Sequence, residues 1–460
     1  MSNEKNPLHK NPLPRAEFWN EFVREVPGWY TDAKLGIFVS WGPFSVPAFG
    51  EPIGELGTVS PEIWFKTNPY AEWYLNTMKI QGSGAQLHHK EFYGDAPYDD
   101  FLDQWQIPDF DPDQWCKLFS YAGAKYIVPL SKHHDGVTLW DAPGTGTRNT
   151  VHRGPKIDLM QAIADAARAN DIRFAVYYSG GLDWGLDILP PIQNFEDVYG
   201  LRPNDAAYSM YAYEQVMDLI ERYEPDLLWN DIEWPDFSKL NDSSVDYTLA
   251  KLFKNYYEKV PHGLVNDRWG NTHHDFTTSE YQALSEAEDS AVWENCRGIG
   301  MSFGYSQFET EEHSLSVAGA LTHFIDVVSR GGNLLLNVGP TASGQIPEIQ
   351  KKVLEGMGDW MALHSEAIYE TRKVENLLAS DPETDSTWVR FTGKKDRIYA
   401  IIEGSGEQSI TLPPGFVIDE SAKLLADGSD LKARRQKEVL IIELPVANVV
   451  GPQVVEFRRS

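Results

Sequence analysis

Residues 157–178, IDLMQAIADAARANDIRFAVYY, hold a predicted helix followed directly by a predicted strand. Apolar residues recur at intervals of three and four in its first half, at Ile157, Met160, Ile163 and Ala167. This spacing predicts an amphipathic helix over Ile157–Arg168. The largely apolar run Ile172–Tyr178 predicts a strand buried on both faces. Such a pairing is typical of a parallel sheet covered by helices.

The same alternation extends over residues 31–369. The other expected strands are Lys34–Val39, Lys125–Leu130, Asp226–Trp229, Leu264–Asp267, Thr277–Tyr281, Ala291–Glu294 and Asn333–Val338. The other expected helices are Tyr70–Ile80, Asp113–Tyr121, Asp205–Tyr223, Tyr247–Tyr257, Val317–Ser329 and Glu348–His364. A count near eight strands favours a (β/α)8-like TIM barrel in which some helices are missing or distorted. The main alternative is an open doubly wound sheet, but no G-x-G-x-x-G motif follows a strand.

Two further regions flank the predicted barrel. Residues 1–30 are polar and proline-rich, and predict an N-terminal arm with one short helix over Ala16–Val26. Residues 370–460 contain short alternating segments separated by turn residues, at Trp388–Phe391, Arg397–Ile402, Gln408–Leu412, Ala422–Leu425, Val439–Leu444 and Val454–Phe457. This pattern predicts a small C-terminal β-sandwich.

The composition restricts the possible partners. Forty Lys and Arg against 68 Asp and Glu give a net charge of −28, which disfavours nucleic acid and anionic membrane surfaces and suits a neutral substrate. No apolar run approaches the ~18 residues of a membrane helix. The first residues lack the apolar core of a signal peptide. We therefore expect a cytoplasmic location, or a periplasmic or secreted one if an export signal has been trimmed. The oligomeric state stays open.

Polar residues beside aromatic ones follow strand after strand. Examples are Ser40-Trp41-Gly42, Lys132-His133-His134-Asp135, Trp229-Asn230-Asp231 and Asp267-Arg268-Trp269. Because the carboxyl ends of barrel strands meet at one face, these side chains are expected to gather there. Aromatic faces suit the C–H surfaces of a sugar, and the polar groups suit its hydroxyls.

Several catalytic chemistries fit these residues poorly. A metal site built on His133 and His134 is disfavoured, since neighbours on a strand point to opposite faces and the first strand ends without the H-x-H pair of a barrel metallohydrolase. No catalytic metal is therefore expected. A serine nucleophile would lack its G-x-S-x-G elbow. Cysteine catalysis is disfavoured because Cys116 lies in the interior of a predicted helix and Cys296 has no obvious base.

The remaining candidate for the catalytic machinery is a pair of carboxylates. Asp231 and Glu280 each stand at a predicted strand end, and spacing alone does not separate them from the competing carboxylates Asp135, Asp183, Glu233, Asp267 and Glu294.

An ordered series of motifs over residues 30–370 resembles glycoside hydrolase family 29, the α-L-fucosidases. The motifs are Lys34–Phe38, Trp41-Gly42, Ser45–Ala48, Glu72–Tyr74, Tyr121–Tyr126, Lys132–Gly136, Tyr177–Ser179, Trp229–Asp231, Asn266–Trp269, Ser302–Tyr305 and Gly331–Pro340. The resemblance implies a barrel with a C-terminal β-sandwich, in agreement with the pattern above. It also implies a retaining exo-α-L-glycosidase that needs no cofactor and acts on small molecules or oligosaccharides with a terminal L-sugar.

The resemblance also implies roles for individual residues. Asp231 falls on the family nucleophile and Glu280 on the general acid/base, with their carboxyl groups expected about 5–5.5 Å apart. The positions that line the sugar subsite are Tyr70, Glu72, Trp73, His133, His134, Tyr178, Trp229 and Arg268. Phe303 resembles the residue that packs on the C5 substituent.

Ser40 departs from the family pattern. The family usually has His here, similar to the residue that holds the axial O4 of fucose, and Val137 stands where Phe is common. An unsatisfied buried hydroxyl costs ~1–3 kcal/mol. These smaller residues therefore narrowly favour an α-L-glucoside, with α-L-fucoside or α-L-galactoside as alternatives. A catalytically inactive sugar-binding barrel is the alternative from another class.

Overall fold

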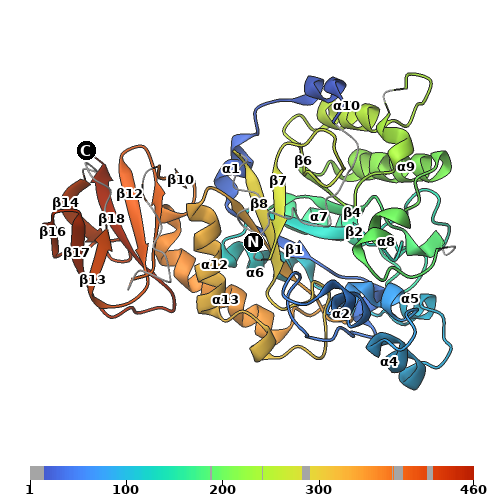
Figure 1. The fold of residues 1–460 in the computed structure, drawn as a ribbon, viewed down its shortest axis with the longest axis horizontal. Coiled ribbons are helices and arrows are strands. Elements are labelled where there is room, and N and C mark those ends of the chain that lie inside the picture. Colours follow the sequence, from blue (N-terminus) through green and yellow to red (C-terminus); the bar gives the residue numbers. More distant parts are fainter. Residues whose placement is uncertain are drawn as a thin grey trace.

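The fold is described from a computed structural model of the 460-residue chain, over residues 15–186, 189–240, 242–281, 291–375, 377, 387–411 and 418–459. A helix-covered barrel lies beside a C-terminal pair of β-sheets (Figure 1). Residues 1–14 of the N-terminal arm predicted over residues 1–30, and Leu412 of a predicted strand, fall outside the described residues. Within the arm, the short 3-10 helix η2 (Glu17–Phe22) lies inside the predicted helix Ala16–Val26. The barrel then follows α1 (Gly28–Ala33).

The barrel sheet has nine strands. They are β1 (Leu35–Val39), β2 (Tyr126–Lys132), β3 (Arg173–Phe174), β4 (Val176–Ser179), β5 (Leu227–Asp231), β6 (Leu264–Val265), β7 (Thr277–Glu280), β8 (Trp293–Gly298) and β9 (Asn333–Val338). Their order is β6-β5-β4-β2-β1-β9-β8-β7, with β3 also paired to β2. All the pairs are parallel. Since β3 leads into β4, the strands fill eight positions, and the Asp275 amide donates to the Val265 carbonyl (2.9 Å) where the two ends of the sheet approach.

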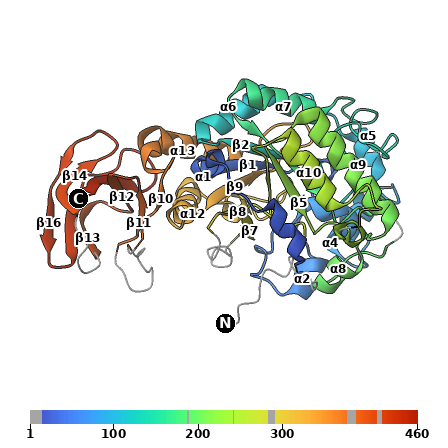
Figure 2. The ribbon, with the colours of Figure 1, turned by 90° about the horizontal axis from the view of Figure 1, so that it is seen from above.

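Helices cover the outside of this sheet (Figure 2). The long ones are α6 (Pro112–Ala122), α7 (Leu159–Ala169), α9 (Ala206–Tyr223), α10 (Leu249–Lys259), α12 (Val317–Ser329) and α13 (Glu348–His364). The chain after β1 instead forms short helices over the barrel mouth, namely η3 (Pro43–Ser45), α2 (Pro61–Lys66), η4 (Ala71–Trp73), α3 (Tyr74–Thr77), α4 (Gly84–Phe92) and α5 (Asp99–Gln104). The predicted TIM barrel with an irregular set of helices is confirmed.

Several predicted bounds need correction. Helix α7 begins at Leu159 because the Asp158 side chain caps it by accepting from the Gln161 amide, which leaves Ile157 before the helix and 38% exposed. The predicted helix Tyr70–Ile80 is only η4 and α3. The strand predicted over Ala291–Glu294 is β8, which runs on to Gly298. It is fully buried although Asn295 is polar, because Asn295 donates to the Ser279 hydroxyl (3.0 Å) and bonds His323 of helix α12 (2.7 Å) on the outer face of the sheet.

The C-terminal region is a sandwich of two antiparallel sheets. One has the order β10 (Arg372–Lys373), β11 (Val389–Gly393), β12 (Arg397–Ile402), β18 (Gln453–Arg459), β14 (Ile418–Leu424) and β15 (Asp430–Leu431), and the other has β13 (Gly406–Thr411), β17 (Val439–Leu444) and β16 (Ala433–Gln436). Apolar residues of both sheets share one core. The other face of the larger sheet joins the barrel core through Tyr399, Ile401 and Val454. The predicted boundaries at residues 30 and 370 stay predictions.

No helix among the described residues is long and apolar enough to span a membrane.

Candidate active site

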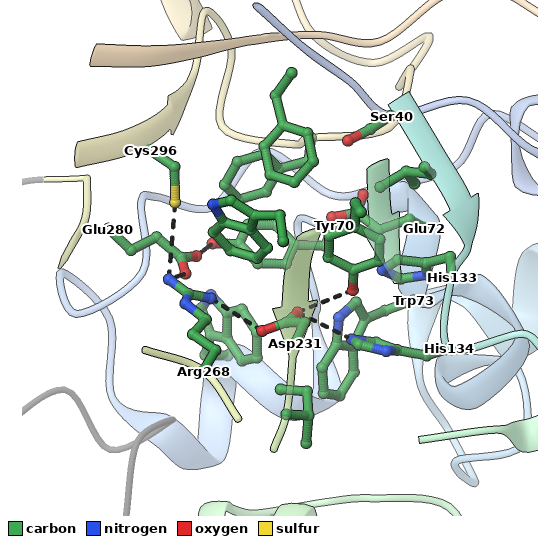
Figure 3. Close-up of a pocket in the computed structure, with 17 residues that line it drawn as sticks. Ser40, Tyr70, Glu72, Trp73, His133, His134, Asp231, Arg268, Glu280 and Cys296 are labelled. Carbon is green, nitrogen blue, oxygen red and sulfur yellow. Dashed lines mark hydrogen bonds and ion pairs between the residues drawn. The ribbon is translucent and has the colours of Figure 1, made fainter. Parts of the chain in front are cut away.

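A pocket opens where the barrel strands end (Figure 3). Its walls come from seven strands or the segments that follow them: Phe38, Ser40, Trp64, Tyr70, Glu72, Trp73, Leu130, His133, His134, Tyr177, Trp229, Asp231, Ile232, Arg268, Glu280, Cys296 and Phe303. Parallel strands bring their carboxyl ends to one face, which explains why residues so distant in the sequence meet here. Aromatic rings and ionisable groups alternate around the pocket, as in a site for a sugar.

Asp231, the last residue of β5, is held by hydrogen bonds at both oxygens. The Tyr177 hydroxyl donates to Oδ2 (2.9 Å), and Arg268 Nη1 donates to Oδ1 (3.1 Å). His134 Nε2 lies 3.8 Å from Oδ2. These contacts fix the orientation of the carboxylate in the pocket, as a nucleophile requires.

Glu280, the last residue of β7, is the second carboxyl group in the pocket. Tyr70 donates its hydroxyl to Oε1 (2.8 Å), and Arg268 Nη2 donates to Oε2 (3.1 Å). Burial raises the pKa of Glu280 and the charge of Asp231 raises it further, whereas Arg268 acts in the opposite direction. Glu280 therefore keeps its proton to higher pH than an exposed glutamate, as a general acid must.

Arg268 connects the two carboxylates. Its Nη1 and Nη2 bond Asp231 and Glu280, its Nε donates to the Thr278 hydroxyl (3.1 Å), and its guanidinium lies over the Trp229 ring at 4.6 Å. One rigid group therefore sets the position of both carboxylates. The separation of about 5–5.5 Å expected for them stays a prediction.

Both neighbouring histidines turn into the pocket, with ring centroids 4.0 Å apart. The His134 Nδ1 atom bonds the Ser179 hydroxyl (2.7 Å). Burial, together with the charge of Lys132, lowers the pKa of His134 to about 3, and burial also puts the pKa of His133 well below its usual value. The neutral rings can donate to or accept from hydroxyl groups. Within the described part of the chain, His133 Nδ1 is buried without a partner.

Glu72 is a third carboxyl group in the pocket wall. It accepts hydrogen bonds from the Gly304 amide (2.7 Å) and the Ser302 hydroxyl (3.4 Å). Burial raises the pKa of Glu72 to about 8 despite the backbone hydrogen bonds that lower it. At neutral pH Glu72 is therefore largely protonated and can donate as well as accept.

Of the twelve residues predicted for the site, Tyr178 alone lies outside the pocket walls. Its hydroxyl donates to Gln215 Oε1 (2.8 Å), and its ring lies 4.5 Å from Lys132 Nζ on the outer side of the sheet. Its neighbour Tyr177 takes the pocket position, since successive residues of a strand point to opposite faces. The prediction of Tyr178 was wrong by one residue.

Val137, which stands where the family commonly has Phe, was expected to leave room at the sugar, but it lies elsewhere. It is buried in the core outside the barrel sheet rather than in the pocket wall. Its exchange for a larger residue would therefore not fill space at the sugar.

Sequence reasoning missed six of the described wall residues: Phe38, Trp64, Leu130, Tyr177, Ile232 and Cys296. The alternation of β4 could have selected Tyr177. Cys296 lies opposite Glu280 in the β7–β8 register, and its sulfur accepts from Arg268 Nη2 (3.7 Å). That contact depends on strand pairing, which the local sequence does not encode.

The competing carboxylates are engaged outside the pocket. Asp135 accepts from Tyr98, Asp183 pairs with Lys132, and Asp267 accepts from Thr278. Glu233 pairs with Lys239 at 2.8 Å. None of these four lines the pocket, nor does Glu294, so among the residues that the structure describes its acidic residues are Asp231, Glu280 and Glu72.

Glu294 lies inside the barrel and accepts from Trp229 Nε1 (2.9 Å), Tyr30 (3.0 Å) and Tyr126 (2.5 Å). Glu294→Leu is expected to lower the free energy of unfolding by about 3 kcal/mol or more, because it leaves three buried donors without an acceptor. Glu294→Gln keeps an acceptor for Trp229 and should cost less than half as much. Urea unfolding measures both variants, and a leucine variant as stable as the wild type would contradict this account.

Among the described residues, no group of three or more His, Cys, Asp and Glu side chains is arranged to hold a metal ion.

Comparisons with known proteins agree with this geometry. The model of the family described as alpha-L-fucosidase matches residues 8–366. The α-L-fucosidase of Dictyostelium discoideum is 31% identical over 396 residues, which cover 84% of this chain and 79% of that protein. The tissue α-L-fucosidase of Homo sapiens is 31% identical over 389 residues, covering 82% of this chain and 76% of that protein.

Solved structures are similar over nearly the whole chain. An α-L-fucosynthase of Thermotoga maritima has a TM-score of 0.86 at 41% identity, covering 98% of this chain and 100% of that one. The α-fucosidase of the same organism, in complex with fucose, has a TM-score of 0.84 at 40% identity, covering 96% and 99%. The family match spans more than half of the sequence, and its relatives share both sequence and fold. The chain therefore belongs to the α-L-fucosidase family.

Proposed function

We propose that this protein is a retaining exo-α-L-glycosidase that hydrolyses terminal α-L-hexosides by double displacement. The observation that carries the proposal is the pair Asp231 and Glu280, which bond neighbouring nitrogens of Arg268 in one pocket. The two groups differ in environment, and burial together with the charge of Asp231 raises the pKa of Glu280. Such a difference suits one nucleophile and one acid.

In the first step Asp231 attacks the anomeric carbon, and the bond from that carbon to the leaving oxygen breaks. Glu280 donates its proton to that oxygen, so the leaving group departs as a neutral alcohol. In the second step the Glu280 carboxylate removes a proton from water, and the resulting hydroxide attacks the anomeric carbon. Asp231 departs as a carboxylate. Two inversions at one carbon give net retention.

The remaining walls suit a single sugar ring. Glu72, Trp73, His133 and His134 offer hydrogen bonds along one side of the pocket. The ring of Phe303 offers an apolar surface for the C5 substituent. The walls are mostly buried, which supports removal of a terminal residue rather than cleavage inside a chain.

Two terminal sugars are candidates. The relatives are named α-L-fucosidases, and one was solved with fucose, which supports an α-L-fucoside. Ser40, a small residue in the pocket wall where the family usually has His, supports an α-L-glucoside, whose O4 is equatorial and whose C6 carries a hydroxyl. An α-L-galactoside shares only the C6 hydroxyl.

The test is turnover of nitrophenyl α-L-fucoside, α-L-galactoside and α-L-glucoside, compared by kcat/KM. Nuclear magnetic resonance of the first-formed sugar reports its anomer, and the proposal requires the α form. Absence of turnover with all three, together with sugar binding by calorimetry, would instead support an inactive sugar-binding barrel.

Ser40→His is expected to shift the preference toward α-L-fucoside. One new buried hydrogen bond is worth about 0.5–1.5 kcal/mol, or roughly two- to tenfold in kcat/KM. The imidazole should also weaken α-L-glucoside by filling the space near its O4. Ser40→Ala is the control, since it removes the hydroxyl without adding bulk. A wild type that already prefers fucoside, with an unchanged ratio in the histidine variant, would make the enzyme an ordinary α-L-fucosidase.

A further inference from the structure

Ser40, Asn337 and Phe303 form a buried hydrogen-bonded chain at one corner of the pocket. The Ser40 hydroxyl bonds Asn337 Oδ1 (2.7 Å), and Asn337 Nδ2 donates to the Phe303 carbonyl (2.7 Å). Ser40 is 2% exposed and Asn337 is 0% exposed. Ser40 and Phe303 line the pocket, whereas Asn337, on β9, lies behind them.

The carbonyl of Phe303 fixes the direction of both hydrogen bonds. A carbonyl oxygen only accepts, so the amide nitrogen of Asn337 must face Phe303 and its oxygen must face Ser40. That oxygen carries no hydrogen, so Ser40 must donate. A serine hydroxyl has one hydrogen, and only its lone pairs remain for a ligand.

We propose that Asn337 is a positioning residue that makes Ser40 solely a hydrogen-bond acceptor toward the sugar. This corner of the pocket then selects a glycone whose hydroxyl donates there. Resting on the proposed function, we assign this hydroxyl to C4. The substrate class is therefore an α-L-hexoside with a free 4-hydroxyl, and a 4-deoxy, 4-fluoro or 4-O-alkyl glycone is rejected.

The test uses aryl α-L-glycosides of the better sugar, with hydroxyl, hydrogen or fluorine at C4. Fluorine can accept a hydrogen bond weakly but cannot donate one. With the wild type, kcat/KM should be at least about tenfold lower for the 4-deoxy substrate than for the 4-hydroxy substrate. The 4-fluoro substrate should have a kcat/KM no higher than that of the 4-deoxy substrate.

Asn337→Ala frees the Ser40 hydrogen, so the ratio of the 4-fluoro to the 4-deoxy substrate should rise about two- to fivefold over the wild type. Comparing this ratio between enzymes cancels the intrinsic effect of fluorine on the reaction. Asn337→Asp is the matched control: its carboxylate still accepts from Ser40 but cannot donate to Phe303. It should therefore keep the wild-type ratio even if overall activity falls.

Each outcome has a distinct meaning. If the wild type turns over no α-L-hexoside, the proposed function fails. If it turns over the parent sugar while a folded Asn337→Ala variant keeps the wild-type ratio, the inference fails and the proposed function stands. Should Asn337→Ala not fold, Ser40→Ala decides: an undiminished preference for the 4-hydroxyl over the 4-deoxy substrate in that variant overturns the inference.

Discussion

Asp231→Gly is expected to reduce kcat by about 10⁴-fold or more, equivalent to about 5.4 kcal/mol in the barrier. The substitution removes the group proposed to form the covalent intermediate and leaves space beneath the anomeric carbon. A small anion can occupy that space, so added azide should restore turnover of substrates with good leaving groups. Initial rates with and without azide measure the effect.

The anomeric configuration of the azide product identifies the nucleophile more directly than the rate does. Azide that replaces Asp231 attacks from the same side, so the glycosyl azide should have the β configuration, inverted relative to the substrate. In Glu280→Ala, azide instead attacks the intermediate carried by Asp231 and should give the α-azide. Full activity of Asp231→Gly, or an α-azide from it, would remove Asp231 as nucleophile.

Glu280→Ala is expected to separate substrates by their leaving groups. A dinitrophenolate departs without protonation, so its release should slow only a few-fold. An alkyl or sugar alkoxide needs the proton, so its release should slow by about 10²–10⁴-fold. The measurement is kcat/KM over aryl and alkyl glycosides of graded leaving-group pKa.

The same variant should change the pH profile. The pKa of Glu280 is raised by burial and by Asp231, and the acid must hold its proton in the first step. In the wild type, kcat/KM should therefore fall as the pH rises through this raised pKa. In Glu280→Ala, measured with a dinitrophenyl glycoside, that alkaline decline should disappear. An equal loss of kcat/KM for every leaving group, together with an alkaline decline that persists, would assign the acid to another group. Glu72 is the remaining acidic residue among the pocket residues that the structure describes.

The order of the barrel elements was predictable because apolar strands and amphipathic helices leave strong local periodicities. Helix α13 has the predicted bounds Glu348–His364. The prediction failed where buried polar side chains have partners far away in the sequence. Strand β8 is fully buried yet contains Glu294, Asn295 and Arg297, so hydrophobicity did not mark its extent. Their partners include Tyr30 on α1, His323 on α12 and Glu55 in a loop, which the local sequence does not reveal.

The candidate site was predictable to the level of strand ends, but not always to the correct face. Adjacent tyrosines at 177 and 178 carry identical side chains, so composition could not choose between them. The hydrogen bond between Ser40 and Asn337 links residues separated by 297 positions. Its direction depends on a third residue, Phe303, and becomes evident only when all three are placed together.

The bridge formed by Arg268 implies that the acid and base roles of Glu280 are timed by the state of Asp231. Before the reaction, the guanidinium shares its charge between two carboxyl groups, and the negative charge of Asp231 favours protonated Glu280. Once Asp231 is esterified by the sugar, that negative charge is gone while Arg268 remains. The proton affinity of Glu280 then falls, in step with its release of the proton to the leaving group. Formation of the ester therefore lowers the pKa of Glu280, and the same carboxyl group is then ionised and able to act as a base toward water.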